Sequence, residues 1–325
     1  MGGLGEIPER ALRSLLLTLS RRRAIGALAT HLPITRAMVA RFVAGADLAE
    51  ALEVIAGLRE RGLRWTVDVL GEAVTSVELA AAAADRYVRT IDALAERGLE
   101  VNVSLKLSQM GLLVDRAACR ANVERIFAAA AARGGFVRID MEDHTMVEAT
   151  LALWRELRPH NPSSGVVIQA ALRRSAADVE ALIAEGARVR LCKGAYKEPP
   201  SVAFVTKAEV DRSFAALMER LLLAGTYPAI ATHDIRLIRR AIAIAREHGI
   251  GPERFEFQML YGVRRDLQER LVREGWRVRV YVPYGTEWYP YFMRRLAERP
   301  ANVLFLLRSL AGEARADLRR RGRPG

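Results

Sequence analysis

The sequence is poor in cysteine, in histidine and in long apolar runs, and each shortage excludes a class of protein. Two cysteines among 325 residues are too few for a disulfide framework or a thiolate metal site. The five histidines show no ligand spacing such as HExxH, so we expect no structural metal. No apolar run approaches the roughly 18–20 residues that span a bilayer. The N-terminus also lacks the layout of a secretory signal, so we expect a cytoplasmic protein.

Aromatic residues are scarce as well, at 6%, whereas basic residues are in excess and give a net charge of +12. Such an excess can attract nucleic acid or an anionic membrane surface. Much of it is scattered arginine, with denser runs at 20–23 and 319–325. Solvated surface charge is the simplest interpretation, and membrane attraction and then nucleic-acid binding are the alternatives.

From residue 65 onward, short β-branched runs alternate with helical stretches rich in Ala, Leu, Glu and Arg. The expected strands are 64–69, 100–107, 136–141, 165–170, 188–194, 229–233, 254–259 and 277–282. The clearest helices between them are 76–98, 175–186 and 234–249. Ser175 and Asp178 form a capping-box-like pair at the start of the second helix.

Eight alternating strands and helices are typical of an α/β protein with a closed (β/α)8 TIM-like barrel. A doubly wound open sheet is the competing fold, but no GxGxxG motif follows any expected strand. We predict an N-terminal helical arm over 1–63, the barrel over 64–313 and a charged tail over 314–325.

Polar residues occur at or just beyond the ends of all the expected strands. In a barrel the C-terminal strand ends carry the functional groups, so these side chains are expected to meet at one mouth. They are Asp68, Glu72, Lys106, Asp140, Glu142, Asp143, Gln169, Arg190, Lys193, Tyr196, Thr232, His233, Asp234, Glu256, Gln258, Tyr281 and Tyr284. Mutual neutralisation of buried charges explains any one of them as well as function does, but it does not explain the whole set.

The segment 281–296 concentrates aromatic residues beside two adjacent arginines, Arg294 and Arg295. If 287–298 is helical, Tyr291 lies one turn from both arginines. Two guanidiniums that reach the same small anion form a charge-assisted clamp suited to a carboxylate. A solvated arginine pair next to core aromatics is the alternative.

Taken together, these segments resemble the proline dehydrogenase family of flavin-dependent enzymes. The matching pieces, in family order, are DVLGEA (68–73), SLKLSQMG (104–111), RIDMED (138–143), VVIQAAL (166–172), RLCKGAYKE (190–198), ATHD (231–234), FEFQMLYG (255–262) and VYVPYGTEWYPYFMRRLAERPAN (280–302). The last piece and KGAY are the most specific. The resemblance implies a barrel that binds FAD across its C-terminal face, with the eighth helix over the barrel mouth.

The resemblance also implies roles for the matching side chains. Asp140 and Arg190 would be catalytic, the first as an organiser and the second as a cation near the reactive edge of the flavin. The implied proline-binding residues are Lys106, Tyr281, Tyr291, Arg294 and Arg295. Glu72 would pair with Arg294 as a gate. The implied FAD contacts are Met141, Gln169, Arg190, Lys193, Gly194, Ala195, Tyr196, Thr232 and His233.

The implied reaction is the oxidation of L-proline to 1-pyrroline-5-carboxylate, the first step of proline catabolism to glutamate. Electrons would pass to a quinone-type acceptor, and the basic charge would favour peripheral contact with an anionic membrane. The chain ends soon after the barrel, which resembles the monofunctional bacterial type of the family and leaves self-association open. On the residues alone, a Schiff-base aldolase using Lys106 or Lys193 and a non-catalytic nucleic-acid binder remain alternatives.

Overall fold

The computed structural model describes residues 39–71, 73–289 and 291–293. The chain divides into two compact units, one formed by Ala44–Tyr284 and the other by Met1–Val43 with Gly285–Gly325. The first unit contains every strand and helix named below. Residues 1–38 of the predicted arm, the predicted tail and most of the predicted eighth helix lie outside the described residues, so the predicted domain boundaries stay predictions.

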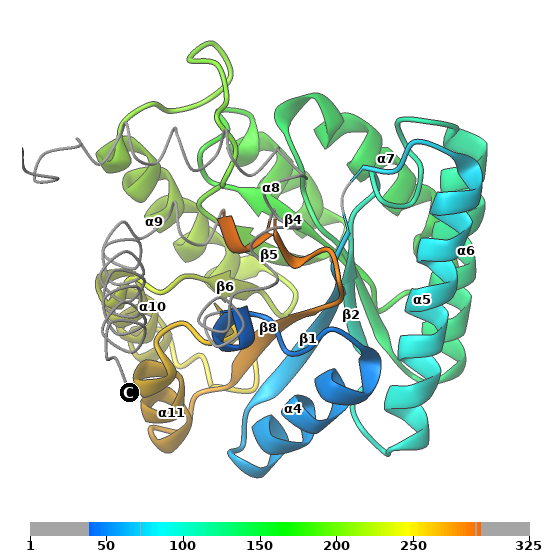
Figure 1. Cartoon of the computed structure of the whole chain (residues 1–325). Helices are drawn as coiled ribbons and strands as arrows, with labels where there is room; N and C mark the ends of the chain where they lie inside the picture. The colour runs from blue at the N-terminus through cyan, green and yellow to red at the C-terminus, as the bar shows by residue number, and fades with distance from the viewer. Residues whose placement is uncertain (1–38, 72, 290, 294–325) are drawn as a thin grey trace, which may run out of the picture. The chain divides into compact units, whose positions relative to one another are not determined.

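Eight parallel strands form a closed barrel in chain order (Figure 1). They are β1 (Arg64–Val69), β2 (Asn102–Leu105), β3 (Phe136–Ile139), β4 (Gly165–Gln169), β5 (Arg188–Cys192), β6 (Ala229–Ala231), β7 (Glu256–Leu260) and β8 (Val278–Tyr284). The pairing of β8 with β1, in which Thr66 lies opposite Tyr281, closes the ring. The predicted barrel and its eight strands are confirmed, although several strands are shorter than the predicted runs.

Helices surround the barrel and connect successive strands (Figure 1). They are α4 (Leu48–Glu60), α5 (Val77–Glu96), α6 (Arg116–Ala132), α7 (Val147–Leu157), α8 (Ser175–Ala184), α9 (Lys207–Ala224), α10 (Ile235–Glu247) and α11 (Arg265–Arg273), with short 3-10 helices η1 (His144–Met146) and η2 (Arg158–His160). The helix α4 precedes β1 and belongs to the same unit as the barrel. No helix in the described part of the chain is long and apolar enough to cross a membrane.

Alternation along each strand separates an apolar layer from a polar interior. Val67 and Val69 of β1 join the buried core that also includes residues of the helices. Thr66, which directly precedes Val67, faces the inside of the barrel, where its hydroxyl oxygen lies 3.1 Å from that of Ser104 on β2. The same alternation places arginines inside the barrel, namely Arg138, Arg188, Arg190 and Arg279. Because barrel interiors are more often filled by branched apolar residues, this polar interior is a distinctive feature of the chain.

The predicted capping box at Ser175 is wrong. The side chain of Ser175 caps no helix, because its buried hydroxyl donates to the Gln169 carbonyl at 2.6 Å, at the end of β4. A capping box does occur at the start of α9, where the side chains of Thr206 and Glu209 each accept from the other residue's backbone amide.

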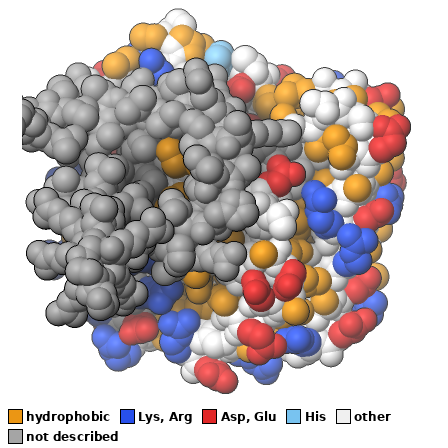
Figure 2. Space-filling model, viewed as in Figure 1, with side chains coloured by type: hydrophobic (Ala, Val, Ile, Leu, Met, Phe, Trp, Pro, Cys, Tyr) orange, Lys and Arg blue, Asp and Glu red, His pale blue; other side chains and the backbone are white. Residues whose placement is uncertain are grey.

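Ion pairs join neighbouring helices on the outside of the barrel, and we call this set the outer belt. Its pairs are Arg97–Glu53, Arg125–Asp85, Arg133–Asp92, Arg120–Glu156, Arg220–Glu180 and Arg240–Glu219. Figure 2 shows acidic and basic side chains interspersed over the face that carries α4 and α5. The arginines of the outer belt are therefore balanced locally by carboxylates, while the net charge of +12 comes from the remaining basic residues.

Candidate active site

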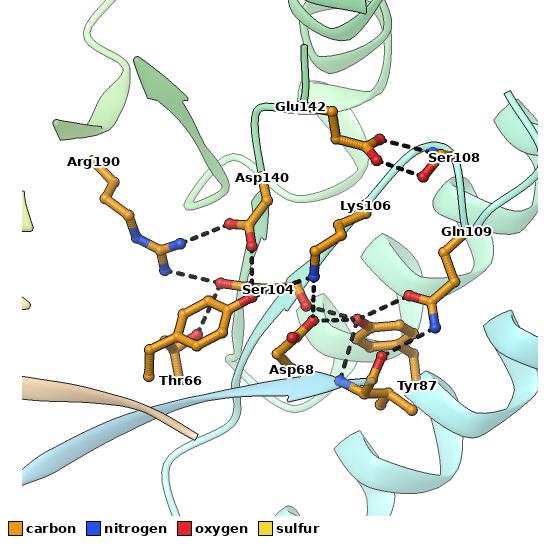
Figure 3. Close-up of polar contacts among 12 residues, drawn as sticks. Thr66, Asp68, Tyr87, Ser104, Lys106, Ser108, Gln109, Asp140, Glu142 and Arg190 are labelled. Atoms are coloured by element: carbon orange, nitrogen blue, oxygen red, sulfur yellow. Dashed lines mark hydrogen bonds and ion pairs between the residues drawn. The ribbon is translucent and has the colours of Figure 1, made fainter. Parts of the chain in front are cut away.

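Lys106 lies just beyond β2, at the C-terminal end of this strand, and Figure 3 shows its ammonium group directed at Asp68. Its Nζ donates to Asp68 Oδ1 at 2.8 Å and to the Tyr281 hydroxyl at 3.4 Å. The Asp68 side chain is only 1% exposed, whereas that of Lys106 is 18% exposed. The ammonium group is thus anchored by a buried carboxylate, and part of the Lys106 side chain is exposed.

Arg190 on β5 is held by partners on three strands or strand ends, of which Figure 3 shows Asp140 and Ser104. One terminal nitrogen donates to Asp140 Oδ1 at 2.6 Å, and the other donates to Ser104 Oγ at 2.9 Å. Its Nε donates to Gln258 Oε1 on β7. The guanidinium carbon also lies 5.2 Å from the ring centroid of Tyr281. These contacts allow the guanidinium one orientation.

Asp140 and Tyr281 connect the two cations. The Tyr281 hydroxyl donates to Asp140 Oδ2 at 2.7 Å and accepts from Lys106. Burial raises the pKa of Tyr281 well above its usual value, and the nearby charges of Asp140 and Asp68 raise it further. The phenol therefore stays protonated and remains a donor. Asp140 contacts Arg190 directly, and its described link to Lys106 runs through this phenol, which refines the organising role predicted for Asp140.

The residues that follow β5 form one wall of the mouth. Lys193 donates to Asp211 Oδ1 at 2.5 Å and lies 3.5 Å from Asp234 Oδ2. Gly194 has a φ of +106°, and a Cβ there would lie 3.0 Å from Gln169 Oε1, so a side chain is disfavoured both by strain and by space. Ala195 and Tyr196 are exposed beyond it.

Gln169 at the end of β4 has a fixed amide. Its Nε2 donates to the Glu142 carbonyl oxygen at 2.5 Å. The Glu142 side chain accepts from the Ser108 amide at 2.9 Å and from the Ser108 hydroxyl. Burial raises the pKa of Glu142, although the bonds from Ser108 oppose that shift. Met141 is buried next to it in the chain, with 8% of its surface exposed.

Thr232 and His233 follow β6 on the neighbouring side of the mouth. Thr232 is buried, and its hydroxyl accepts from the Asp234 amide at 3.1 Å. His233 Nε2 accepts from the Leu260 amide at 3.0 Å. A neutral His233 ring therefore carries its proton on Nδ1.

Four predicted substrate or gate residues are not brought to this site by the described structure. Glu72, Arg294 and Arg295 lie outside the described residues. Tyr291 belongs to the other compact unit, where it is 6% exposed. The carboxylate clamp and the gate thus stay predictions.

Two strand-end residues do not share the predicted mouth. The Tyr284 hydroxyl lies 2.6 Å from Thr90 Oγ1 on α5, so this side chain points outward from the barrel. Glu256 opens β7 and is paired with Arg279 deep inside the barrel, with 2% of the Glu256 side chain exposed. For these two residues the expectation of a single mouth is wrong.

The sequence interpretation also missed polar residues below the mouth, among them Thr66, Ser104 and Arg279. The signal was available, because arginine recurs at every second position in RVRL (188–191) and RVRV (277–280). In a strand that spacing puts the arginines on one face. A face of arginines inside a closed barrel requires acceptors there.

A closed parallel barrel with charged side chains gathered at its C-terminal end is the architecture of barrel enzymes. The proline dehydrogenase family model matches residues 51–308. The chain is 40% identical over 299 residues to proline dehydrogenase 1 of Bacillus subtilis subsp. natto, covering 92% of this chain and 99% of that protein. It is also 40% identical over 307 residues to proline dehydrogenase of Deinococcus radiodurans, covering 93% and 98%. The chain belongs to the proline dehydrogenase family.

A solved structure supports the same fold. The crystal structure of proline utilization A from Bdellovibrio bacteriovorus, inactivated by N-propargylglycine, superposes with a TM-score of 0.76 at 27% identity. The match covers 90% of this chain but only 35% of that protein. The chain therefore corresponds to about one third of that larger protein.

Proposed function

We propose that this protein is a proline dehydrogenase that uses FAD to oxidise L-proline to 1-pyrroline-5-carboxylate. The observation that carries the proposal is the pair of cations, Lys106 and Arg190, fixed at the barrel mouth and joined through Asp140 and Tyr281. One cation can hold a substrate carboxylate, and the other can stabilise negative charge that develops during oxidation.

Proline binding is assigned first to Lys106, whose ammonium is anchored by Asp68 and whose side chain is partly exposed. The Tyr281 ring forms an apolar wall with a polar tip beside it. From the family resemblance we further propose that Tyr291, Arg294 and Arg295 complete the clamp and that Glu72 serves with Arg294 as its gate. Cations around the carboxylate disfavour a second positive charge on the substrate nitrogen, which helps the amine lose its proton.

The residues after β4, β5 and β6 fit FAD. A cation, Lys193, is followed by a glycine at which the backbone takes a left-handed conformation and leaves no room for a Cβ. The residues that would hold the cofactor are Met141, Gln169, Arg190, Lys193, Gly194, Ala195, Tyr196, Thr232 and His233. When bound, FAD supplies the two-electron acceptor that the oxidation of an amine requires.

Asp140 acts as an organiser in this proposal. Its Oδ1 accepts from Arg190 and its Oδ2 accepts from Tyr281. Both oxygens therefore already serve to orient neighbouring side chains. Arg190, held in one orientation, is the cation that stabilises the charge gained on reduction.

Electrons leave the proposed enzyme toward a quinone-type acceptor. We further propose a cytoplasmic location with peripheral contact to an anionic membrane surface, and the net charge of +12 supports the membrane contact. Binding to anionic vesicles that weakens as salt is added would test this part separately.

The Schiff-base alternative is disfavoured by the same geometry. A lysine nucleophile must be neutral when it attacks a carbonyl. Lys106 is instead paired with the buried Asp68, and Lys193 lies between Asp211 and Asp234. Both lysines are thus engaged by carboxylates, an arrangement that suits a charged contact and not attack on a carbonyl.

The deciding experiment is an absorbance spectrum before and after anaerobic addition of L-proline. Flavin bands that bleach on addition support cofactor, substrate and reaction together. Flavin bands that persist would overturn the assignment of L-proline as the substrate. A colourless protein that does not take up added FAD, and that borohydride traps with a carbonyl substrate, would support the aldolase.

Substitution of Lys106 tests its proposed contact with the carboxylate. Lys106→Met should weaken proline binding by roughly 1.5–3 kcal/mol, the range for a hydrogen bond to a charged group, or about tenfold to a hundredfold. The FAD spectrum should be unchanged. Arg125→Met, which removes a cation from the outer belt, controls for total charge and should leave the KM for proline unaltered. An unchanged KM in Lys106→Met would contradict the assignment.

A further inference from the structure

Below Arg190 the barrel contains a continuous row of hydrogen-bonded side chains, which we call the interior column. Its members, from the lower end to the mouth, are Glu100, Arg279, Glu256, Gln258 and Arg190. Arg279 donates to Glu100 Oε1 at 3.0 Å and to Glu256 Oε1 at 2.8 Å. Gln258 Nε2 donates to Glu256 Oε1 at 2.6 Å, and Gln258 Oε1 accepts from Arg190 Nε. The column connects the mouth with the opposite end of the barrel.

The amide of Gln258 has only one orientation that satisfies both neighbours. An ionised carboxylate only accepts hydrogen bonds, and a guanidinium only donates them. The Nε2 of Gln258 must therefore face Glu256, and its Oε1 must face Arg190. Burial alone would raise the pKa of Glu256, but the charge of Arg279 and the bonds from Arg279 and Gln258 hold it at about 2. Glu256 is thus ionised at neutral pH and fixes the amide.

The two arginines of the interior column have different hydrogen-bond partners. Arg279 contacts two carboxylates directly, Glu256 and Glu100. Arg190 contacts one carboxylate, Asp140, together with an amide oxygen and a hydroxyl. An acid in place of Gln258 would add a second negative charge next to Arg190. The neutral amide of Gln258 instead fixes the orientation of Arg190 without adding charge.

We propose that Gln258, oriented by Glu256, is a positioning residue that holds Arg190 in one orientation while leaving its positive charge available at the barrel mouth. The inference rests on the proposed function in one respect, which is that the charge stabilised by Arg190 is that of reduced FAD. A loss of this arrangement lowers the reduction potential of the bound cofactor, because the reduced form loses its counter-charge.

The acid that replaces the amide offers a titratable test. In Gln258→Glu, a protonated carboxyl copies the amide, since its hydroxyl donates to Glu256 and its carbonyl accepts from Arg190. Ionised, it offers no donor to Glu256 and places a negative charge next to Arg190. The charged and titratable groups around this position are Glu256 on the same strand, Arg279 and Tyr281 on β8, Arg188 and Arg190 on β5, Arg138 on β3 and Asp140 just beyond β3.

The experiment is a spectroscopic titration of the midpoint potential of the bound FAD from pH 5.5 to 9, in wild type and Gln258→Glu. We expect the two potentials to converge at the acid end. At the alkaline end the midpoint potential of the variant should lie below that of wild type by about 30 mV, which corresponds to a tenfold change in a two-electron equilibrium. A difference between the two midpoint potentials that does not change with pH, in a variant that binds FAD and is reduced by proline, would overturn the inference. The proposed function would then remain intact.

Two further variants keep the test decisive. Gln268→Glu changes another buried glutamine, on α11, whose amide donates to the Leu260 and Val263 carbonyls away from the column. It should alter stability without moving the potential. Gln258→Met removes both bonds without adding charge, and it should lower the potential by a smaller, pH-independent amount. If Gln258→Glu does not fold, a wild-type potential in Gln258→Met would overturn the inference. Failure of wild type to bind FAD would instead overturn the proposed function.

Discussion

The interior column and the outer belt are built from the same ingredients, arginine and carboxylate, in two different surroundings. In the belt, the side chains of Arg125 and Asp85 are 50% and 47% exposed. In the column, those of Arg279 and Glu256 are each 2% exposed. Exposed pairs are screened by water and contribute little, whereas a buried charge deprived of its partner is strongly destabilising. The burial of an ion pair, far more than the number of pairs, therefore determines how much stability is lost when one partner is removed.

The interior also shows how a buried cation is held without direct contact with a carboxylate. Arg138 donates to the Val166 and Arg188 carbonyls at 2.9 and 2.8 Å, and its guanidinium lies 4.8 Å from the Phe136 ring centroid. Burial lowers the pKa of Arg138, and the nearby charge of Arg190 adds to this effect. Gly165 allows the arrangement, because a Cβ there would lie 2.2 Å from the Arg188 carbonyl oxygen and 3.0 Å from an Arg138 terminal nitrogen.

The largest expected effect comes from breaking the pair inside the barrel. Arg279→Met leaves Glu256 buried without its main counter-charge, so we expect a loss of about 3–5 kcal/mol in the free energy of unfolding. Urea denaturation measures it. The double variant Arg279→Met/Glu256→Met should recover much of the loss, because a buried pair can be replaced by apolar side chains at little cost. Additive losses would contradict this account.

Acid should reveal the same pair. The pKa of Glu256 is held at about 2, below its ordinary value of 4.5, so its contribution to stability is present above pH 4.5 and is lost as the pH falls toward 2. The free energy of unfolding of Glu256→Gln should therefore change less than that of wild type between these pH values. The two curves should be compared by urea denaturation at each pH. Equal slopes would show that Glu256 is not the titrating group.

An intermediate effect is expected at the capping box of α9, where exposed groups meet in fixed geometry. Thr206→Ala removes the hydroxyl that accepts from the Glu209 amide. We expect a loss of about 1 kcal/mol, which a shift in the urea midpoint would measure. Thr206→Ser keeps the acceptor and should restore most of the stability. A Ser variant as unstable as the Ala variant would point to loss of the methyl group instead.

The smallest effect is expected in the belt. Arg125→Ala should change the free energy of unfolding by less than about 1 kcal/mol. High salt should reduce even this difference, because exposed charges are screened. A loss as large as that of Arg279→Met would remove the contrast between the two regions.

Much of the fold was predictable because its signals are local. Strands with β-branched residues at period 2, helices ended by glycine and polar strand ends all lie within short segments. The direction of Tyr284 was predictable in principle, because it lies three residues after Tyr281 and an odd spacing in a strand puts two side chains on opposite faces. Ser175 resembled a helix cap in sequence, but its hydroxyl had a closer acceptor at the end of β4.

The role of Gln258 was not predictable in this way. Its two partners come from β5 and from its own strand, and its importance depends on their opposite charges. The family resemblance pointed to Arg190 but not to the side chains that orient it. Contacts between strands far apart in the sequence are set by barrel closure, which no short segment contains.

Barrel closure also determines when the interior forms during synthesis. Arg279 donates to the Trp65 carbonyl at 2.6 Å, and these residues are 214 positions apart in the chain. The strand β1 cannot pair with β8 until nearly the whole barrel has left the ribosome, and such distant pairings form slowly. Until then, water can reach the charged face of the unclosed sheet. A nascent chain of this protein therefore exposes charged side chains where a barrel with an apolar interior would expose hydrophobic surface. This difference should limit aggregation while the last strand is being made.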